Sequence, residues 1–345
     1  MTRRPRTPTL TLALIAALAA ATAIVVAAII AGSDDGSGRA ATSPGIGPGD
    51  PSAASEHAVQ VALPSVVQVE SEEKLGSGIV FDSDGDIVTN AHVVSGSRTF
   101  TITTSDGKRH RATLRGAFPA SDLAVVRVDG DDLKPARFAD SGKLKVGERV
   151  LAIGNPLGLR SSVTDGIVSA VARTVSEGNG VALPSVVQTS AAINPGNSGG
   201  ALIDLTGAVV GIPTLAATDP ELGGSAAPGV GFAISSDTVT RIAGQLAKQG
   251  HVVASGRASL GVDLRSLPDG GVMVASVAGG GPSAKAGVRA GDLIAAIAGR
   301  PVGSLDAVSL ALANRKPGDS VRVELRRPDG STPTVSVKLG QLPGS

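Results

Sequence analysis

Three short motifs contain a histidine, an aspartate and a serine that could act together in acyl transfer. His92 stands in the run TNAHVV, Asp122 in SDLAVV and Ser198 in NPGNSGG. A serine hydroxyl is a poor nucleophile unless a base takes its proton, and histidine has a suitable pKa for that step. A buried carboxylate fixes the histidine tautomer and stabilises the imidazolium. The chain order His, Asp, Ser therefore predicts peptide hydrolysis, with Ser198 as nucleophile, His92 as base and Asp122 as the orienting group.

The glycines around the candidate nucleophile predict an oxyanion-binding turn. The tetrahedral intermediate of acyl transfer carries a negative oxygen, which backbone N–H groups can stabilise. Glycine lets the backbone turn such groups inward without a Cβ clash. By position, the expected donors are the N–H groups of Gly196 and Ser198.

Short Val- and Ile-rich runs must position these residues. They recur from His57 to about Ser235, separated by Gly, Pro and Asp-Gly, and this pattern predicts a mostly β fold of two small barrels. The first barrel would carry the histidine and the aspartate, and the second would carry the serine. A helix closed by Gly250 is expected over residues 237–249. Strands are expected at 65–69, 78–81, 99–103, 124–128 and 208–212.

Several segments, taken in order, resemble the HtrA/DegP family of serine proteases. They are residues 76–94, 154–158, 166–170, 192–200 and 229–234. The resemblance implies a chymotrypsin-like double β-barrel at 56–250 and a PDZ domain of the α+β class at 254–342. It also implies an extracytoplasmic serine endopeptidase that hydrolyses misfolded or regulatory proteins through an acyl-enzyme. The chain departs from the usual family residues at Leu157, Ser190, Ala201 and Pro213.

Residues 282–294 are similar to the middle of a PDZ domain, where a short helix leads through a Gly-Asp turn into a strand. A second helix is expected at 304–314 with Ser304 as N-cap, and strands are expected at 261–263, 271–274 and 321–325. PDZ domains bind a peptide C-terminus by adding it to a sheet edge. The expected peptide-binding residues are Arg257, Leu260, Gly261 and Val262.

The primary substrate pocket is expected to prefer small or medium aliphatic side chains, because no acidic residue stands near its candidate lining. A buried Arg or Lys side chain there would lack a charge partner. The candidate lining residues are Ala192, Ile193, Gly211, Ile212, Pro213 and Thr214. HtrA-like proteases are commonly trimers held by aromatic residues. Residues 56–74 contain none, so a monomer or a weak homotrimer is expected.

The N-terminus predicts a membrane anchor. Arg3, Arg4 and Arg6 precede an uncharged run at 9–31. At about 1.5 Å per residue this run spans about 34 Å, enough for the ~30 Å hydrocarbon core of a bilayer. A cytoplasmic basic tail at 1–8, a single-pass transmembrane helix at 9–31 and a flexible linker at 32–55 are expected, with the later domains outside the cell membrane. A cleaved signal peptide is the alternative, although Ile29 suits position −3 of a cleavage site poorly.

The composition argues against several other classes of protein. With 31 basic and 30 acidic residues, and without Trp or Tyr, the chain offers neither the charge nor the stacking platforms of a nucleic-acid-binding protein. There is no Cys, and His57, His110 and His251 share no metal-ligand spacing, so neither a metal nor a cofactor is expected. Two alternative functions stay open. One is a chaperone-like peptide binder on an inactive protease fold, and the other is an esterase that uses the same triad.

Overall fold

The computed structural model describes residues 51–129, 133–155, 162–178, 180–194, 196–219 and 225–344. Within these ranges no helix is both long enough and apolar enough to cross a membrane. The predicted basic tail at 1–8, the anchor at 9–31 and most of the linker at 32–55 lie outside the described residues.

Helix α2 (Pro51–Ala62) begins inside the stretch that was expected to be a flexible linker. Ala58 and Ala62 stand four residues apart and therefore lie on one face of the helix. Both are buried and belong to the main hydrophobic core of the protease-like region. Residues 51–55 of the expected linker are therefore helical, because a Ser- and Ala-rich segment can still bury small side chains against a larger surface.

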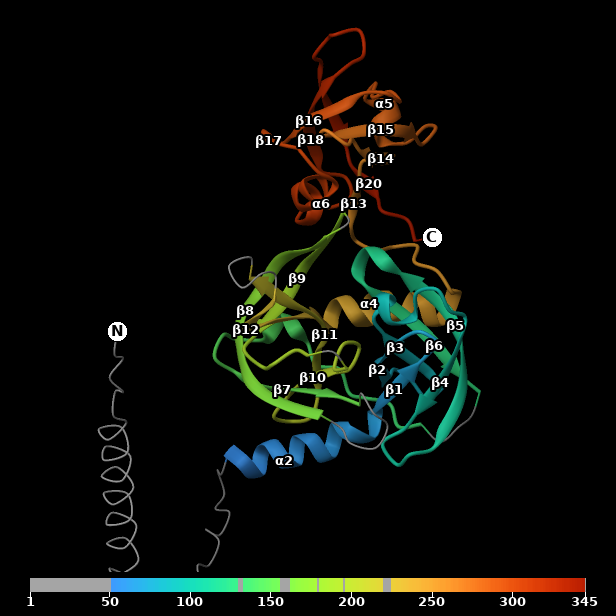
Figure 1. Ribbon diagram of the computed structural model, residues 1–345, viewed down its shortest axis with the longest axis vertical. Coiled ribbons are helices and arrows are strands. Elements are labelled where there is room, and N and C mark those ends of the chain that lie inside the picture. Colours follow the sequence, from blue (N-terminus) through green and yellow to red (C-terminus); the bar gives the residue numbers. More distant parts are fainter. Residues whose placement is uncertain are drawn as a thin grey trace, which may run out of the picture. The chain divides into compact units, whose positions relative to one another are not determined.

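Six short strands close into the first barrel, in the order β1-β2-β3-β6-β5-β4 (Figure 1). Its interior is mainly aliphatic: Ile87, Ile102 and Val126 are completely buried, and Phe100 packs in the same cluster. The strands lie close to the expected positions, and the expected run 99–103 coincides with β4. They are β1 (Val66–Glu70), β2 (Leu75–Val80), β3 (Asp86–Thr89), β4 (Thr99–Thr103), β5 (Arg109–Phe118) and β6 (Leu123–Val128).

A second barrel follows, in the order β10-β11-β12-β9-β8-β7 (Figure 1). The long β8–β9 hairpin extends beyond the body of this barrel toward the C-terminal domain. The strands are β7 (Arg149–Gly154), β8 (Ser162–Gly178), β9 (Val181–Thr189), β10 (Ala201–Asp204), β11 (Val209–Asp219) and β12 (Ser225–Ser235).

Helix α4 (Ser236–Gln249) packs against strands of both barrels. Its apolar side chains follow the helical period, and Val239, Ile242 and Leu246 have no exposed surface. Gly250 ends the helix in a left-handed conformation at φ 77°, and its N–H donates to the Leu246 carbonyl. The helix predicted at 237–249 is thus confirmed, and it ties the two barrels together.

The C-terminal domain is a separate sheet with its own core. Its strands run in the order β14-β15-β16-β18-β19, with β17 paired to β16. Helix α6 begins after Ser304, whose side chain accepts from the Ala307 N–H as predicted. The elements are β13 (Ala258–Ser259), β14 (Val262–Ser266), β15 (Val272–Val277), α5 (Pro282–Lys285), β16 (Leu293–Ile297), β17 (Arg300–Pro301), α6 (Leu305–Ala313), β18 (Ser320–Arg326), β19 (Thr334–Lys338) and β20 (Gly340–Gln341).

We predict that Arg127→Met destabilises the first barrel by about 3 kcal/mol, because it leaves the buried carboxylate of Asp86 without a charge partner. The Arg127 Nε atom donates to Asp86 Oδ1 at 2.8 Å and its second nitrogen contacts Oδ2, while the aspartate side chain is 1% exposed. Urea unfolding followed by circular dichroism measures the loss. Arg109→Met is the matched control, because its partner Glu70 is 45% exposed and such a pair contributes under about 1 kcal/mol. Equal losses in the two variants would contradict the prediction.

Candidate active site

The register of two strands brings His92 and Asp122 together. In the β3–β6 pair, Thr89 stands opposite Ala124, so the residues just beyond each strand end meet at one edge of the barrel. His92 lies in the short helix α3 (Ala91–Val94), and Asp122 follows the 3-10 turn η2 (Pro119–Ser121). The Asn90 side chain donates to the Asp122 carbonyl at 3.0 Å and joins the two loops. The close pairing predicted from the motifs is present in the structure.

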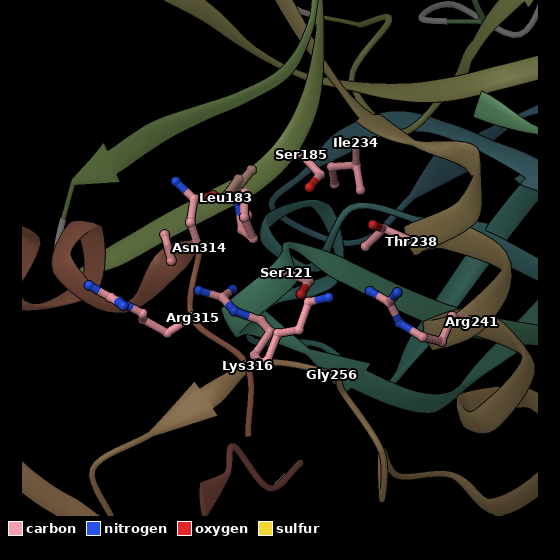
Figure 2. Close-up of a pocket in the computed structure, with 13 residues that line it drawn as sticks. Ser121, Leu183, Ser185, Ile234, Thr238, Arg241, Gly256, Asn314, Arg315 and Lys316 are labelled. Atoms are coloured by element: carbon pink, nitrogen blue, oxygen red, sulfur yellow. The ribbon is translucent and has the colours of Figure 1, made fainter. Parts of the chain in front are cut away.

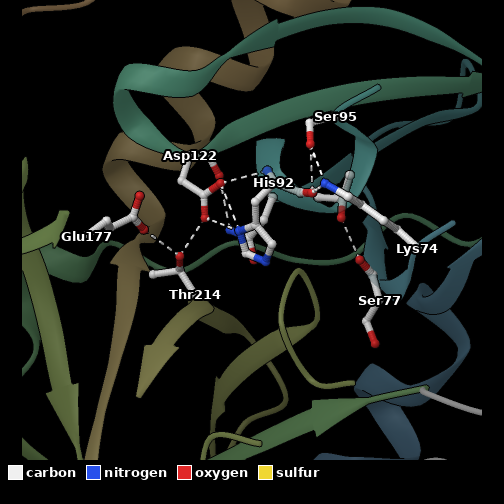
Figure 3. Close-up of polar contacts among 9 residues, drawn as sticks. Lys74, Ser77, His92, Ser95, Asp122, Glu177 and Thr214 are labelled. Carbon is white, nitrogen blue, oxygen red and sulfur yellow. Dashed lines mark hydrogen bonds and ion pairs between the residues drawn. The ribbon is translucent and has the colours of Figure 1, made fainter. Parts of the chain in front are cut away.

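Asp122 holds the imidazole through two kinds of contact (Figure 3). His92 Nδ1 lies 2.9 Å from Oδ2 and 3.0 Å from Oδ1, and the His92 backbone N–H donates to Oδ1 at 3.0 Å. The aspartate side chain is 4% exposed, whereas the histidine side chain is 50% exposed. Because Nδ1 carries the proton given to the carboxylate, Nε2 is left as the base on the accessible side of the ring.

Two opposing effects set the proton affinity of His92. Burial lowers the pKa of His92, but the hydrogen bond and negative charge of Asp122, together with the charge of Glu177, raise it more, so the pKa lies above its ordinary value. Asp122 itself adopts a left-handed backbone at φ 48°, which is uncommon for a residue other than glycine. Such a conformation is typical of functional sites whose surroundings hold it in place.

The Ser198 loop is fixed to the first barrel by Ser77, a fully buried residue of β2. The Ser77 hydroxyl donates to the Gly196 carbonyl at 2.6 Å and accepts from the Asn155 N–H at 2.8 Å. Its backbone N–H donates to the Ser198 carbonyl at 3.0 Å. From the sequence, Ser77 falls only within the segment 76–94 that carries the family resemblance, and no role was predicted for it. The one signal available was a serine between two glycines.

The backbone of the serine loop fits the predicted oxyanion-binding turn. Gly196 has φ 108°, a conformation that favours glycine. Among the described residues, no acceptor is bonded to the N–H group of Gly196 or of Ser198. Within the same part of the chain, the Ser198 hydroxyl forms no hydrogen bond with His92. Ser198 is half-buried. It is placed on the same side of the molecule as His92 and Asp122 by its loop, which contacts Ser77 of the first barrel, and not by a hydrogen bond with either residue in the part of the chain that the structure describes.

The structure places the expected pocket residues in different surroundings. Ala192 is exposed, whereas Ile212 has no exposed surface and lies in the main core. Ile193 is 7% exposed and packs in a core cluster of the second barrel. Thr214 was expected to face substrate, but its hydroxyl donates to Asp122 Oδ2 at 2.5 Å. A short run of consecutive residues in a strand cannot all line one cavity, because alternate side chains point to opposite faces.

Glu177 is a second residue that sequence reasoning missed, and no motif marked it. It lies near the end of β8, half-buried, with Oε1 3.0 Å from the Thr214 hydroxyl (Figure 3). Burial, followed by the nearby charge of Asp122, raises the pKa of Glu177 to about 7. A chain of contacts thus runs from Glu177 through Thr214 and Asp122 to His92.

The candidate peptide groove of the C-terminal domain is a cavity of about 240 Å³ beside α6. Of the expected peptide-binding residues, Leu260 and Val262 line it and Gly261 does not; Val308 and Leu312 of α6 line it as well. Gly180 and Val181, at the tip of the β8–β9 hairpin, also line it. The Gly180 N–H donates to Asp306 Oδ1 at 2.5 Å, and the Ser309 hydroxyl donates to the Gly180 carbonyl. The protease-like region therefore contributes part of the groove wall, which the sequence did not predict.

Arg257 differs from its expected role at this groove. One guanidinium nitrogen donates to the Ala182 carbonyl at 2.6 Å, and the other, Nη1, is buried without a partner among the described residues. Burial lowers the pKa of Arg257 to about 10, which the charge of Glu177 partly offsets. Arg257 also lines a second cavity, of about 250 Å³, behind the Asp122 turn. Figure 2 shows this cavity, where Arg241 and Lys316 reach in near Ser121.

Comparisons with known proteins agree with this architecture. Residues 76–212 match the model of the trypsin-like peptidase domain, and residues 258–339 match that of the PDZ domain. Over 83% of its length the chain is 40% identical to the serine protease PepD of Mycobacterium tuberculosis, covering 66% of that protein. It is 39% identical to a probable periplasmic DegP-like serine endoprotease of Halomonas elongata, covering 61% of it. The chain thus spans less than two thirds of the length of these two relatives.

Other matches extend over most of the related protein. The chain is 38% identical to the serine protease Do-like HtrA of Lactococcus lactis and covers 72% of it. It also superposes on a solved HtrA-type protease, AlgW with a tripeptide, with a TM-score of 0.58, 31% identity and coverage of 97% of that chain. On these matches, and on the two barrels followed by a PDZ domain, this chain belongs to the HtrA family of serine proteases.

Proposed function

We propose that this protein is an extracytoplasmic serine endopeptidase whose catalytic residues are His92, Asp122 and Ser198. The observation that supports this most strongly is the short Asp122–His92 pair beside a serine loop that Ser77 fastens to the same barrel. Under this proposal the protease domain spans 56–250 and the PDZ domain 254–342, and no cofactor takes part. The substrates would be misfolded or regulatory proteins.

In the proposed reaction, Ser198 Oγ attacks the scissile carbonyl while His92 Nε2 takes its proton. The N–H groups of Gly196 and Ser198 would stabilise the oxyanion that forms. Asp122 holds the imidazole ring and favours its protonated form in the transition state. Ala192 and Ile193 lie just before the serine loop, so an aliphatic preference in the substrate pocket stays our proposal.

We predict that Ser198→Ala lowers casein turnover by about 10⁴–10⁶-fold, because only binding and the oxyanion donors would remain. A fluorophosphonate probe should label the wild-type protein and fail to label the variant. The fold should persist, because the change removes a single oxygen from a loop.

Ser105→Ala is the matched control for this experiment, since Ser105 is an exposed residue of the β4–β5 turn in the other barrel. It should be labelled like the wild type. A wild-type protein that binds unfolded protein but is not labelled would point to the chaperone-like alternative. Cleavage of a short-chain ester without casein would point to the esterase.

We further propose that the PDZ groove binds peptides with a free C-terminus. The apolar lining by Leu260, Val262 and Leu312 supports this, as do the solved HtrA-type proteases described with a tripeptide or a decapeptide. Because Gly180 and Val181 share the groove wall, an incoming peptide would also meet the β8–β9 hairpin tip. A peptide bound in this groove would therefore contact the protease domain directly.

We predict that a fluorescent peptide ending in valine binds at least about tenfold more tightly than its C-terminal amide, because the amide removes a charged hydrogen-bond acceptor. Fluorescence anisotropy measures both affinities. Leu312→Ser should weaken binding of the free peptide, whereas the exposed Glu324→Gln on β18 should not. Equal affinity for the acid and the amide would reject the groove assignment.

Residues 9–31 are proposed to anchor the protein in the cell membrane, with the folded domains outside and at most a weak homotrimer. We predict that full-length protein expressed in bacteria stays with membranes after a high-salt and carbonate wash, whereas the chain that begins at residue 50 does not, because only the former retains an apolar run of membrane-spanning length. Release of full-length protein, with an intact mass lacking the N-terminal segment, would support the cleaved signal peptide instead.

A further inference from the structure

One hydroxyl group stands between two carboxylates behind the candidate base. Thr214 Oγ1 lies 2.5 Å from Asp122 Oδ2 and 3.0 Å from Glu177 Oε1. Thr214 is 7% exposed. A threonine hydroxyl has one proton to donate and can accept through its lone pairs. The Thr214 hydroxyl cannot donate to Asp122 and to Glu177 at once. If both contacts are hydrogen bonds, one of the two carboxyl groups must be protonated and donate to Thr214.

The contacts of Asp122 decide which carboxyl group supplies that proton. Asp122 receives the His92 backbone N–H, the His92 ring N–H and the shorter of the two Thr214 contacts. All of these groups can donate, so Asp122 is satisfied as an ionised acceptor. Glu177 has the longer contact to Thr214, and its raised pKa of about 7 agrees with a group that is readily protonated. When Glu177 is protonated, it can supply the proton of its own contact with Thr214, and the Thr214 proton is then free for Asp122.

We propose that protonated Glu177 is a positioning residue, which donates to Thr214 and so directs the Thr214 hydroxyl onto Asp122 and fixes the orientation of His92. This inference rests on the proposed function of His92, Asp122 and Ser198. Glu177 touches neither substrate nor the reacting atoms. It acts on the base only through Thr214 and Asp122.

The charged groups around Glu177 come from three other parts of the fold. Asp122, after η2, opposes ionisation of Glu177. His92 on α3, when protonated, and Arg257, between α4 and β13, favour ionisation. Burial opposes it as well and is the largest effect. Because these influences partly cancel, Glu177 changes its charge near neutral pH.

When Glu177 ionises, it can no longer donate to Thr214 and so no longer directs the Thr214 hydroxyl toward Asp122. The Thr214 hydroxyl then has two anionic acceptors and one proton, and each time it donates to Glu177 it leaves Asp122 without that bond. The wild-type rate should therefore fall as Glu177 ionises. The loss should be roughly two- to tenfold, the net value of one hydrogen bond.

The test is the pH profile of kcat on a fluorogenic peptide, measured from pH 5.5 to 9 for the wild type and for Glu177→Gln. The glutamine NH₂ group donates to Thr214 at every pH and cannot ionise. At pH 6 the two proteins should agree within about twofold, and at pH 8.5 Glu177→Gln should be faster by roughly two- to tenfold. Where Glu177 is ionised, its charge raises the pKa of His92, so above about pH 7 less His92 should be protonated in the variant than in the wild type.

Two variants at the middle position separate positioning from general destabilisation. Thr214→Val keeps the shape of the side chain but removes the hydroxyl, so in that background Glu177→Gln should no longer raise the rate at pH 8.5. Thr214→Ser should restore the effect. Glu324→Gln, an exposed carboxylate change on β18, should leave the profile unchanged.

Two results would overturn the proposal. One is an identical pH profile for the wild type and Glu177→Gln. The other is a wild type that gains rate relative to Glu177→Gln above pH 7, since this would mean that the Glu177 charge assists His92 directly. Fluorophosphonate labelling and an NMR titration of the His92 ring distinguish failure of the proposed function from failure of the role of Glu177. Failure of labelling rejects the proposed function, whereas labelled, active protein with an unchanged profile and an unchanged His92 titration rejects only the role of Glu177.

Discussion

The buried hydroxyl of Ser77 is the contact on which the assembly of the candidate site depends. The histidine and aspartate belong to the first barrel, and the serine belongs to the second. Ser77 donates to the Gly196 carbonyl and accepts from the Asn155 N–H, so one side chain of β2 binds two loops of the other barrel. Inside a protein an unpaired hydroxyl is costly, and this geometry satisfies both its donor and its acceptor capacity. The distance between the two halves of the site is thereby set by a buried hydrogen-bonded group.

Close approach of backbone explains the glycines around this contact. A Cβ atom on Gly199 would lie 2.2 Å from the Ser77 carbonyl oxygen, and one on Gly154 would lie 2.5 Å from the Asn197 Cα atom. Neither position has room for a side chain. Gly199, one of the glycines that suggested an oxyanion turn, thus also lets the serine loop approach β2 of the first barrel, whereas Gly154, at the end of β7, lets the same loop approach its own barrel.

The region behind the site is polar and connects it to the C-terminal domain. Glu177 and Gly180 lie on the same β8–β9 hairpin. The first contacts Thr214 near the candidate base, and the second contacts Asp306 and Ser309 on α6. Arg257, between the two domains, faces the charge of Glu177 and also bonds to the Ala182 carbonyl. The hairpin that contacts α6 through Gly180 thus also carries Glu177, which Thr214 alone separates from Asp122.

The sequence alone determined much of this protein, because its signals are local. The aliphatic runs predicted the strands, Gly250 predicted the end of α4, and Ser304 predicted the start of α6. The motifs around His92, Asp122 and Ser198 predicted a triad, of which the His92–Asp122 contact is present in the structure. The roles of Ser77 and Glu177 were decided only by the tertiary structure, since each meets partners far away in the chain. The same holds for Thr214, which the sequence assigned to the substrate pocket, because which neighbour a buried hydroxyl faces depends on strand register and packing.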